Sequence, residues 1–356
     1  MTQHVTMRFK LSLLLRRAWW KGLALLISLN LLLLSLRHFR HEVPAGGVKV
    51  IGYGCQPGIR CGGWADRQKG IVAAFVVAAI LGQEFKVSMP TPCDLGFFLS
   101  PRGTVDWRLE PGELTGRNVA WWDMTGPDWD GFVQEFLSLE DPLVLFDADY
   151  TFITANLETV HLLRKHRLAQ KIAWLQELTV PEIYRLVLTQ LFDLMPGPRV
   201  QLDAFRQALP RDVTLVCAQI RVGGKGDTES FNTVEHFQGL ASFLAPYNTS
   251  AHRLMFTSDN PAMIRHAQSF FPSVAVQMKG PVTHVDRSTG SDVCGGFAHA
   301  ILEQLVLSMC HVLVISESGL AKIASFIRNT DDNLFIFHDG IVEQFKRENP
   351  FPNRKW

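Results

Sequence analysis

From residue 213 onward, short apolar runs alternate with longer stretches in which apolar positions recur every three or four residues. The short runs predict buried strands, and the longer stretches predict helices with one apolar face. The predicted strands are Val213–Ile220, Arg253–Thr257, Val274–Met278, His311–Ile315 and Leu334–Phe337. The predicted helices are Glu235–Leu244, Pro261–Phe270, Gly295–Ser308 and Leu320–Arg328. This alternation predicts a doubly wound α/β domain built on a parallel sheet.

A strand–helix–strand unit opens the preceding part of the chain. The pattern predicts a strand over Val48–Gly54, a helix over Trp64–Gly82 and a strand at Phe85–Val87. A unit of this kind favours parallel strands. Residues 88–130 are rich in proline, glycine and tryptophan, which predicts long surface loops that contain one strand, Asn118–Trp122.

The next apolar run predicts a strand over Pro142–Phe146. Leu157–Leu194 then follows a helical pattern that breaks near Thr179, which can cap a second helix with Pro181 in its first turn. We therefore expect two helices over this stretch.

The sequence Pro-Gly-Pro at residues 196–198 is the strongest break after the N-terminal region, and a helix over Val200–Ala208 follows it. A chain of this length suits two domains of ordinary size. We place the domain boundary at this break, between an N-terminal α/β domain over residues 48–197 and a C-terminal α/β domain over residues 198–356.

Residues 18–36 form an apolar span of about 19 residues in which Lys21 is the one charged side chain, long enough to cross a bilayer. Because more cations precede the span than follow it, residues 1–17 are expected in the cytoplasm and the rest, beginning with a stem at residues 37–47, in the lumen. The alternative is a signal peptide cleaved near Val43–Ala45. Either way the folded part faces an oxidising compartment, and the short span favours a Golgi or ER membrane.

The whole chain of 356 residues has a net charge of +1, which argues against nucleic acid as a partner. Its six cysteines all follow the apolar span, and an even number in the lumen permits disulfides. Cys55 and Cys61 are close enough to close one loop, whereas Cys217 lies inside a predicted strand and is a candidate free thiol. The spacings do not match a zinc site. Asn248 begins an Asn-Thr-Ser glycosylation acceptor sequence, which fits a lumenal location.

Three predicted strands end in polar residues. The first runs into a glycine-rich loop whose cations, Arg221 and Lys225, can bind an anion. The second ends at Asp259, an acid able to bond a base or a ribose, and the third ends at Ser316–Gly319, where hydroxyls and helix amides can hold a phosphate. Each end is also explained as a simple turn or helix cap. Because ligands bind at the carboxyl ends of parallel strands, the three together favour a nucleotide site.

Two further places hold candidate polar groups. Gly62 and Gly63 precede the first predicted helix, and Asp66 and Arg67 lie in its first turn. The amides there can hold an anion or a sugar hydroxyl as part of a cleft. A tight turn in which Asp66 complements the helix dipole is an equally good explanation.

Asp147 and Asp149 follow the predicted strand Pro142–Phe146. Two carboxylates in this pattern could hold a divalent cation against the diphosphate of a nucleotide sugar. They would then define a metal-dependent glycosyltransferase of the GT-A type. Acidic residues also end many strands without binding a metal, so this remains an alternative.

The polar strand ends resemble the donor-site motifs of the GDP-fucose-dependent fucosyltransferases, the superfamily of the α1,2-, α1,6- and protein O-fucosyltransferases. The residues that carry the resemblance are Gln219–Arg221, Thr257–Asp259 and His311–Gly319. Residues 61–70, with Cys-Gly-Gly-x-Ala-Asp-Arg, are similar to the glycine-rich N-terminal motif of plant and bacterial members. The resemblance covers most of residues 50–330 and implies a GT-B-like α/β fold, with two Rossmann-like domains that face a cleft.

The resemblance implies a role for each residue. Arg221 would bind the β-phosphate of GDP, Lys225 falls on a lysine of the α1,6 enzymes, and Glu229 has the spacing of their proposed catalytic base. Asp259 would bond the guanine or the ribose. The remaining donor-binding residues would be Gln219, Ser316, Ser318 and Gly319.

The chain departs from the family at two places. Gln219 stands where the family usually has a histidine, and Gly223–Gly224 replaces a Thr/Gly-Asp pair, with an acid only at Asp227. A relative that does not catalyse transfer but binds a glycan or a secretory cargo is therefore a second alternative.

We expect a lumenal, inverting glycosyltransferase that transfers fucose from GDP-fucose to a glycan or glycoprotein acceptor. Glu229 would take the proton of the attacking hydroxyl. Arg221, Lys225 and helix amides would stabilise the departing GDP, so no metal and no other cofactor is expected. The acceptor would contact loops at residues 88–130 and 280–295.

Overall fold

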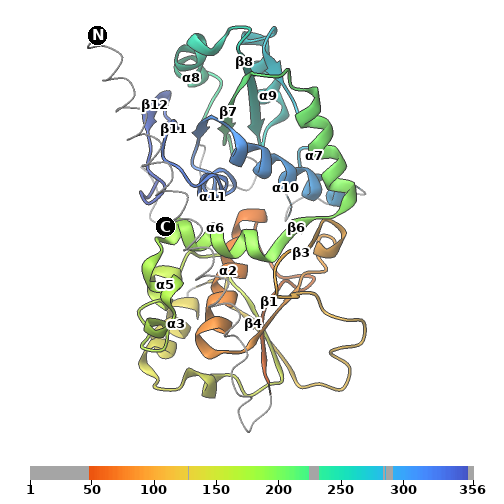
Figure 1. Cartoon of the computed structure of the whole chain (residues 1–356), viewed down its shortest axis with the longest axis vertical. Coiled ribbons are helices and arrows are strands. Elements are labelled where there is room, and N and C mark those ends of the chain that lie inside the picture. Colours follow the sequence, from red (N-terminus) through yellow and green to blue (C-terminus); the bar gives the residue numbers. More distant parts are fainter. Residues whose placement is uncertain (1–47, 127, 224–231, 284, 286–291, 352–356) are drawn as a thin grey trace, which may run out of the picture. The chain divides into compact units, whose positions relative to one another are not determined.

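The structure is a computed structural model that describes residues 48–356 apart from 127, 224–231, 284, 286–291 and 352–356. From Lys49 onward the chain forms one compact unit, which contains two larger sheets and one small one (Figure 1). No helix within the described ranges combines the length and the apolar character that a membrane span requires. The predicted span at residues 18–36 lies outside those ranges.

The first sheet has four parallel strands in the order β2-β1-β5-β4. Their bounds are β1 Val50–Gly54, β2 Glu84–Ser88, β4 Val119–Asp123 and β5 Tyr150–Thr154. All five residues of β1 are buried, as is typical of strands in a parallel sheet whose faces are covered. The predicted strand–helix–strand unit is confirmed, because β1 and β2 are parallel and α2 connects them.

Helix α2 (Trp64–Leu81) is buried along nearly its whole length. From Gly70 onward its sequence is apolar on every side, which is typical of a helix buried inside a protein. Gly82 ends it in the left-handed conformation, with φ of 63°, and its N–H reaches back to the carbonyls of Ala78 and Ala79. The helix therefore forms a rigid support for the loop that precedes Trp64.

The second sheet has six strands in the order β12-β11-β10-β7-β8-β9, and all neighbours except β11 and β12 are parallel. The bounds are β7 Thr214–Ile220, β8 His252–Ser258, β9 Ala275–Val276, β10 Val312–Ile315, β11 Leu334–His338 and β12 Ile341–Gln344. The doubly wound pattern predicted from residue 213 onward is confirmed. The antiparallel edge strand β12 was not predicted.

The helices alternate with these strands. Those beyond α2 are α3 Asp128–Ser138, α4 Val160–Leu163, α5 Ala173–Glu177, α6 Val180–Leu191, α7 Pro196–Ala208, α8 Phe237–Leu244, α9 Pro261–Phe270, α10 Val293–Met309 and α11 Gly319–Arg328. Short 3₁₀ turns are η1 Leu95–Phe97, η2 Pro142–Leu145, η3 Ala169–Lys171 and η4 Ala245–Tyr247, and β3 Leu99–Pro101 pairs antiparallel with β6 Phe192–Leu194. Helix α7 includes the Pro-Gly-Pro break, because proline is tolerated in a first helical turn.

The predicted strand Pro142–Phe146 is wrong. This segment forms the 3₁₀ turn η2, because the side chain of Asp141 accepts from the N–H of Leu143 over 3.1 Å and Pro142 occupies the first turn. The strand of this region is β5, which begins at Tyr150. The helical stretch before Thr179 is also broken into short pieces, whereas Thr179 does cap α6, in a capping box with Glu182.

Three disulfides hold the fold. Cys55 pairs with Cys61, as the spacing predicted, and Cys93 in the first half pairs with Cys294 in α10. Cys217 is bonded to Cys310, so the prediction of a free thiol is wrong.

A buried polar contact also joins α2 to the second half. Gln304 accepts from Trp64 Nε1 over 2.9 Å and exchanges two hydrogen bonds of 2.8 Å with the amide of Gln68. These three side chains bond to one another inside the protein. The contact therefore fixes how α2 and α10 pack against each other.

Candidate functional site

Three polar strand ends meet at one edge of the second sheet. Strands β10, β7 and β8 are parallel neighbours, so their carboxyl ends lie side by side. Hydrogen bonds connect residues at or just after these strand ends across 36 to 97 positions of sequence. The structure thus brings Gln219, Arg221, Asp259 and Ser316 together.

Ser316 joins the end of β10 to the end of β7. Its hydroxyl donates to Oε1 of Gln219 over 2.8 Å and accepts from the backbone N–H of Arg221 over 2.7 Å. Gln219 and Ser316 are both buried. Because a hydroxyl has one proton to donate, Ser316 uses it to hold the strand ends together and offers none to a phosphate.

Asp259 organises the turn that follows β7. Its carboxylate accepts from the backbone N–H groups of Val222, over 2.9 Å, and Gly223, over 3.0 Å. The same carboxylate lies 2.9 Å from Nη1 of Arg221. Gly223 has φ of 82°, a conformation that favours glycine. Helix α9 is capped by Asn260, so Asp259 is not the helix cap that the sequence also allowed.

Both backbone polar groups of Arg221, the N–H and the carbonyl oxygen, are hydrogen-bonded. Its carbonyl oxygen accepts from the backbone N–H of Asn232 over 3.1 Å and from Nδ2 of Asn232 over 3.0 Å. About one fifth of the Arg221 side chain is exposed. A guanidinium carries five N–H donors in a planar fork, so it can pair with Asp259 on one side and with a phosphate on another.

Helix α11 begins at the same edge of the sheet. Ser318 is its N-cap residue, and the Ser318 hydroxyl makes no capping bond to the helix. Gly319 is the first helical residue. The amides of a helix N-terminus carry the positive end of the helix dipole and favour anions. Ser318 and Gly319 therefore lie at a helix N-terminus, and their binding of a phosphate stays a prediction.

Three predicted polar residues of the glycine-rich loop, Lys225, Asp227 and Glu229, lie outside the described residues. The assignment of Glu229 as the base remains a prediction.

The glycine-rich N-terminal motif shapes the loop before α2. Gly62 has φ of 78°, and the N–H of Gly63 donates to Oδ2 of Asp66 over 3.2 Å. Arg67 is buried and donates from Nε to the Gly62 carbonyl over 3.0 Å. Asp66 and Arg67 therefore stabilise the loop that the Cys55–Cys61 disulfide closes.

Asp147 and Asp149 do not end a strand. They lie between η2 and β5, at the amino end of β5. Oδ2 of Asp149 accepts from the N–H of Asn118 over 3.2 Å. In the part of the chain that the structure describes, no group of three His, Cys, Asp or Glu side chains could hold a metal ion. The strand end on which the GT-A alternative depended is thus not formed at these two residues.

The sequence reasoning missed a buried pair on α10. His299 and Glu303 are 4% and 6% exposed, and Nε2 of His299 lies 3.3 Å from Oε1 of Glu303. Nε2 and Oε1 thus face each other as an ion pair, whereas Nδ1 of His299 has no hydrogen-bond partner among the described residues. Gly280 leaves room for the ring, since a Cβ there would lie 2.2 Å from Nδ1.

Buried polar atoms without partners are rare and mark candidate ligand contacts. The available signal was the four-residue spacing, which places both residues on one helix face.

Comparisons with known proteins identify solved structures with a similar fold. No family model and no curated sequence matches the chain. Among solved structures, a point mutant of FUT1 from Arabidopsis thaliana in complex with GDP matches with a TM-score of 0.57 and 12% identity, over 85% of this chain and 72% of that one. The fucosyltransferase NodZ from Bradyrhizobium matches with a TM-score of 0.55 and 13% identity, over 84% and 99%. NodZ α-1,6-fucosyltransferase co-crystallised with GDP matches with a TM-score of 0.54 and 13% identity, over 83% and 97%. The chain therefore has the fold of these fucosyltransferases, which confirms at the level of fold the resemblance that its motifs indicated.

Proposed function

We propose that the protein transfers fucose from GDP-fucose to a hydroxyl group of a glycan or glycoprotein. The observation that carries this proposal is the turn at Arg221, held by Asp259 and Ser316 at the carboxyl edge of a parallel sheet. It supports the proposal because the solved structures of the same fold include complexes with GDP and a crystal soaked with GDP-fucose.

The diphosphate would lie between Arg221 and the start of α11. Arg221 would supply charged donors, and Ser318 with Gly319 would supply a hydroxyl and helix amides. Ser316 and Asp259 would act indirectly, because each is bonded to the strand ends that position Arg221.

The reaction would be a direct displacement with inversion. The acceptor oxygen attacks the anomeric carbon of fucose as the bond from that carbon to the β-phosphate oxygen breaks, and GDP leaves with the electron pair. The acceptor proton passes to a base, for which Glu229 is the candidate. Fixed cations and amides stabilise the charge that grows on GDP.

We further propose that the protein is a single-pass type II protein of the Golgi or ER membrane, with the folded part in the lumen. The apolar residues 18–36, the cations before them and three disulfides in the folded part support this location.

Binding of GDP and GDP-fucose to the full-length protein in detergent, measured by calorimetry, tests the donor site. Arg221→Ala removes a charged phosphate contact of about 1.5–3 kcal/mol, so the Kd for GDP should rise about 12- to 140-fold. Arg206→Ala is the matched control, because Arg206 lies on α7 with its side chain 61% exposed. Equal GDP binding by wild type and Arg221→Ala, or no binding at all, would show that the proposal is wrong.

The arrangement of Gln219 favours one second candidate, a relative that binds the donor without transferring the sugar. Gln219 stands in the place of the family's histidine, and its Oε1 is bonded to Ser316. This candidate predicts normal GDP-fucose binding with neither transfer nor hydrolysis. Release of fucose that continues in the presence of a chelator would exclude both this candidate and the metal-dependent one.

A further inference from the structure

Arg221 lies just beyond the end of strand β7, which stops at Ile220, so the sheet no longer fixes its backbone. Residues from three other elements hold it instead. Ser316, after β10, accepts from its N–H, and Asp259, after β8, pairs with its guanidinium. The third partner is Asn232, before α8, which donates to its carbonyl oxygen. The sequence pattern gave no reason to expect this third contact.

Asn232 uses both its backbone and its side chain for the contact. The two donors, N–H and Nδ2, reach the same carbonyl oxygen of Arg221 over 3.1 and 3.0 Å. Because a carbonyl oxygen can only accept, the amide must present its NH₂ group to Arg221, and this fixes which way the amide points.

The other half of the amide has no use in the packing. Asn232 is 2% exposed, and its Oδ1 has no hydrogen-bond partner among the residues that the structure describes. A buried acceptor without a partner is unfavourable, so a small apolar residue would suit the packing better. The presence of an amide at this position is therefore explained by the bond that it donates to Arg221.

Helix α8 holds Asn232 in place. The next residues form a turn in which Thr233 and His236 exchange two hydrogen bonds of 3.4 Å, from the N–H of each to the side chain of the other. Phe237, the first residue of α8, is fully buried, and its ring centroid lies 6.3 Å from that of Phe256 in β8. Asn232 is thus attached to the hydrophobic core of the second sheet.

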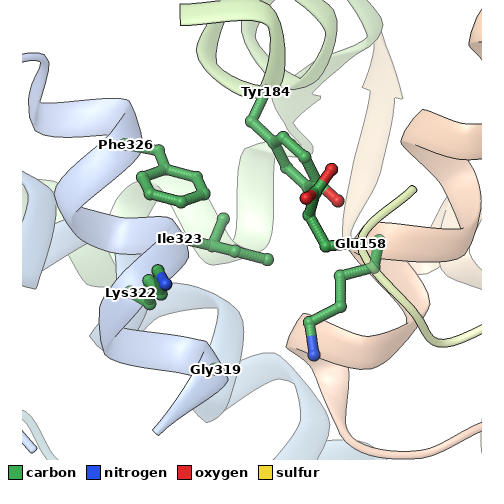
Figure 2. Close-up of a pocket in the computed structure, with 7 residues that line it drawn as sticks. Glu158, Tyr184, Gly319, Lys322, Ile323 and Phe326 are labelled. Carbon is green, nitrogen blue, oxygen red and sulfur yellow. The ribbon is translucent and has the colours of Figure 1, made fainter. Parts of the chain in front are cut away.

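The partner of the Arg221 N–H is attached to a packed helix as well. Ser316 lies just before α11, and Figure 2 shows Ile323 and Phe326 of this helix facing Tyr184 of α6. The rings of Tyr184 and Phe326 are 5.5 Å apart, edge to face. Two packed helices therefore fix the two ends of one peptide segment. Such positioning matters because a charged contact that is misplaced by about 1 Å loses much of its effect.

We propose that Asn232 is a positioning residue for Arg221: its side-chain amide holds the Arg221 carbonyl so that the guanidinium meets the diphosphate of the donor. The inference rests on the proposed function, because it requires Arg221 to bind phosphate. Asn232 itself contacts no phosphate and acts only through Arg221. Alanine would leave the backbone bond alone, and an ionised aspartate would set a negative oxygen against the carbonyl oxygen.

A double-mutant cycle tests whether Asn232 acts through Arg221. Calorimetric titration of the full-length protein in detergent gives the Kd for GDP of each variant. Asn232→Ala loses one hydrogen bond, so the Kd should rise about 2- to 13-fold. In an Arg221→Ala background the same substitution should change the Kd by no more than about twofold, because nothing is left to position. A purely structural role would give equal effects in both backgrounds.

Asn232→Asp provides a second test, based on pH. At about pH 8 the carboxylate cannot donate and also repels GDP, so the Kd should exceed that of Asn232→Ala. Burial beside a carbonyl favours the neutral carboxyl, whose O–H can donate to Arg221 again. At about pH 5 the Kd of Asn232→Asp should therefore be lower than that of Asn232→Ala. Loss of the charge alone would make the two variants equal.

Gln207→Glu is the control for the change from amide to acid, because Gln207 lies exposed on α7, and its Kd should match wild type at both pH values. Thermal unfolding checks that each variant is folded. The proposal is overturned if Asn232→Ala binds GDP as wild type does, if its effect is the same with and without Arg221, or if Asn232→Asp does not bind more tightly than Asn232→Ala at about pH 5. Absence of GDP binding by wild type, or an Arg221→Ala variant that binds equally well, would instead refute the proposed function.

Discussion

Asp259→Asn separates two roles that the carboxylate of Asp259 could have at the donor site. In the structure this carboxylate accepts from two backbone N–H groups and pairs with Arg221. The substitution keeps the shape of the side chain but leaves one neutral acceptor oxygen. If Asp259 only repelled the diphosphate, its neutralisation would strengthen GDP binding. If it holds the turn for Arg221, GDP binding must weaken.

The hydrogen bonds set the expected magnitude. A bond to a charged acceptor contributes about 1.5–3 kcal/mol and a bond to a neutral one about 0.5–1.5 kcal/mol. The variant loses one charged bond and weakens the other, and the site is about one fifth exposed, so we expect a net loss of about 1.5–2.5 kcal/mol in the ordered turn. If GDP binds only the ordered turn, its Kd should rise about 12- to 60-fold.

Calorimetric titration of the full-length protein with GDP measures this change, and thermal unfolding checks that the variant is folded. Asp203→Asn on α7 is the matched control, since the side chain of Asp203 is 50% exposed and lies 4.0 Å from Arg206. GDP binding that stays equal or becomes tighter in Asp259→Asn would refute the positioning role.

Three further predictions address stability and location. Burial lowers the pKa of Lys322 from 10.5 to about 8. Between these two pH values the unfolded chain binds more protons than the folded protein, so the free energy of unfolding should rise with pH. Lys322→Met should reduce that slope, measured by urea unfolding at several pH values, by up to about 1.4 kcal/mol per pH unit. Equal slopes for wild type and variant would contradict this. Replacing both Cys93 and Cys294 by serine opens a link across 201 residues and should lower stability by about 5 kcal/mol, against about 2 kcal/mol for Cys55 and Cys61, six residues apart; a larger thermal shift for the second pair would reverse the expected order. Asn248 is exposed at the turn after η4, so the protein made in a secretory host should lose mass with an N-glycosidase and Asn248→Gln should not; an unchanged wild type would argue against the lumenal location.

Periodicity predicted most of the second half because each element there has a buried face. Strand β8 and helices α9 and α11 occur within one or two residues of their predicted bounds. The error at Pro142–Phe146 has a local cause. Five residues with mainly apolar side chains satisfy a strand pattern, but Asp141 and Pro142 start a 3₁₀ turn, and the neighbouring β5 takes the place in the sheet. The pairing of Cys217 with Cys310 had no local signal, because it depends on β10 lying beside β7.

The sequence by itself determined which polar residues stand at the ends of strands, since apolar runs and the residues that stop them are local properties. It therefore predicted that Arg221, Asp259 and Ser316 lie at neighbouring strand ends, and the structure brings the three into contact. The tertiary structure alone decided what each side chain does there. Ser316 and Asp259 bond to the chain around Arg221, and α11 and the segment after β5 enclose a cavity of about 560 Å³. These contacts join residues from 37 to more than 150 positions apart, and strand order and helix packing, which bring such residues together, are not encoded in any short segment.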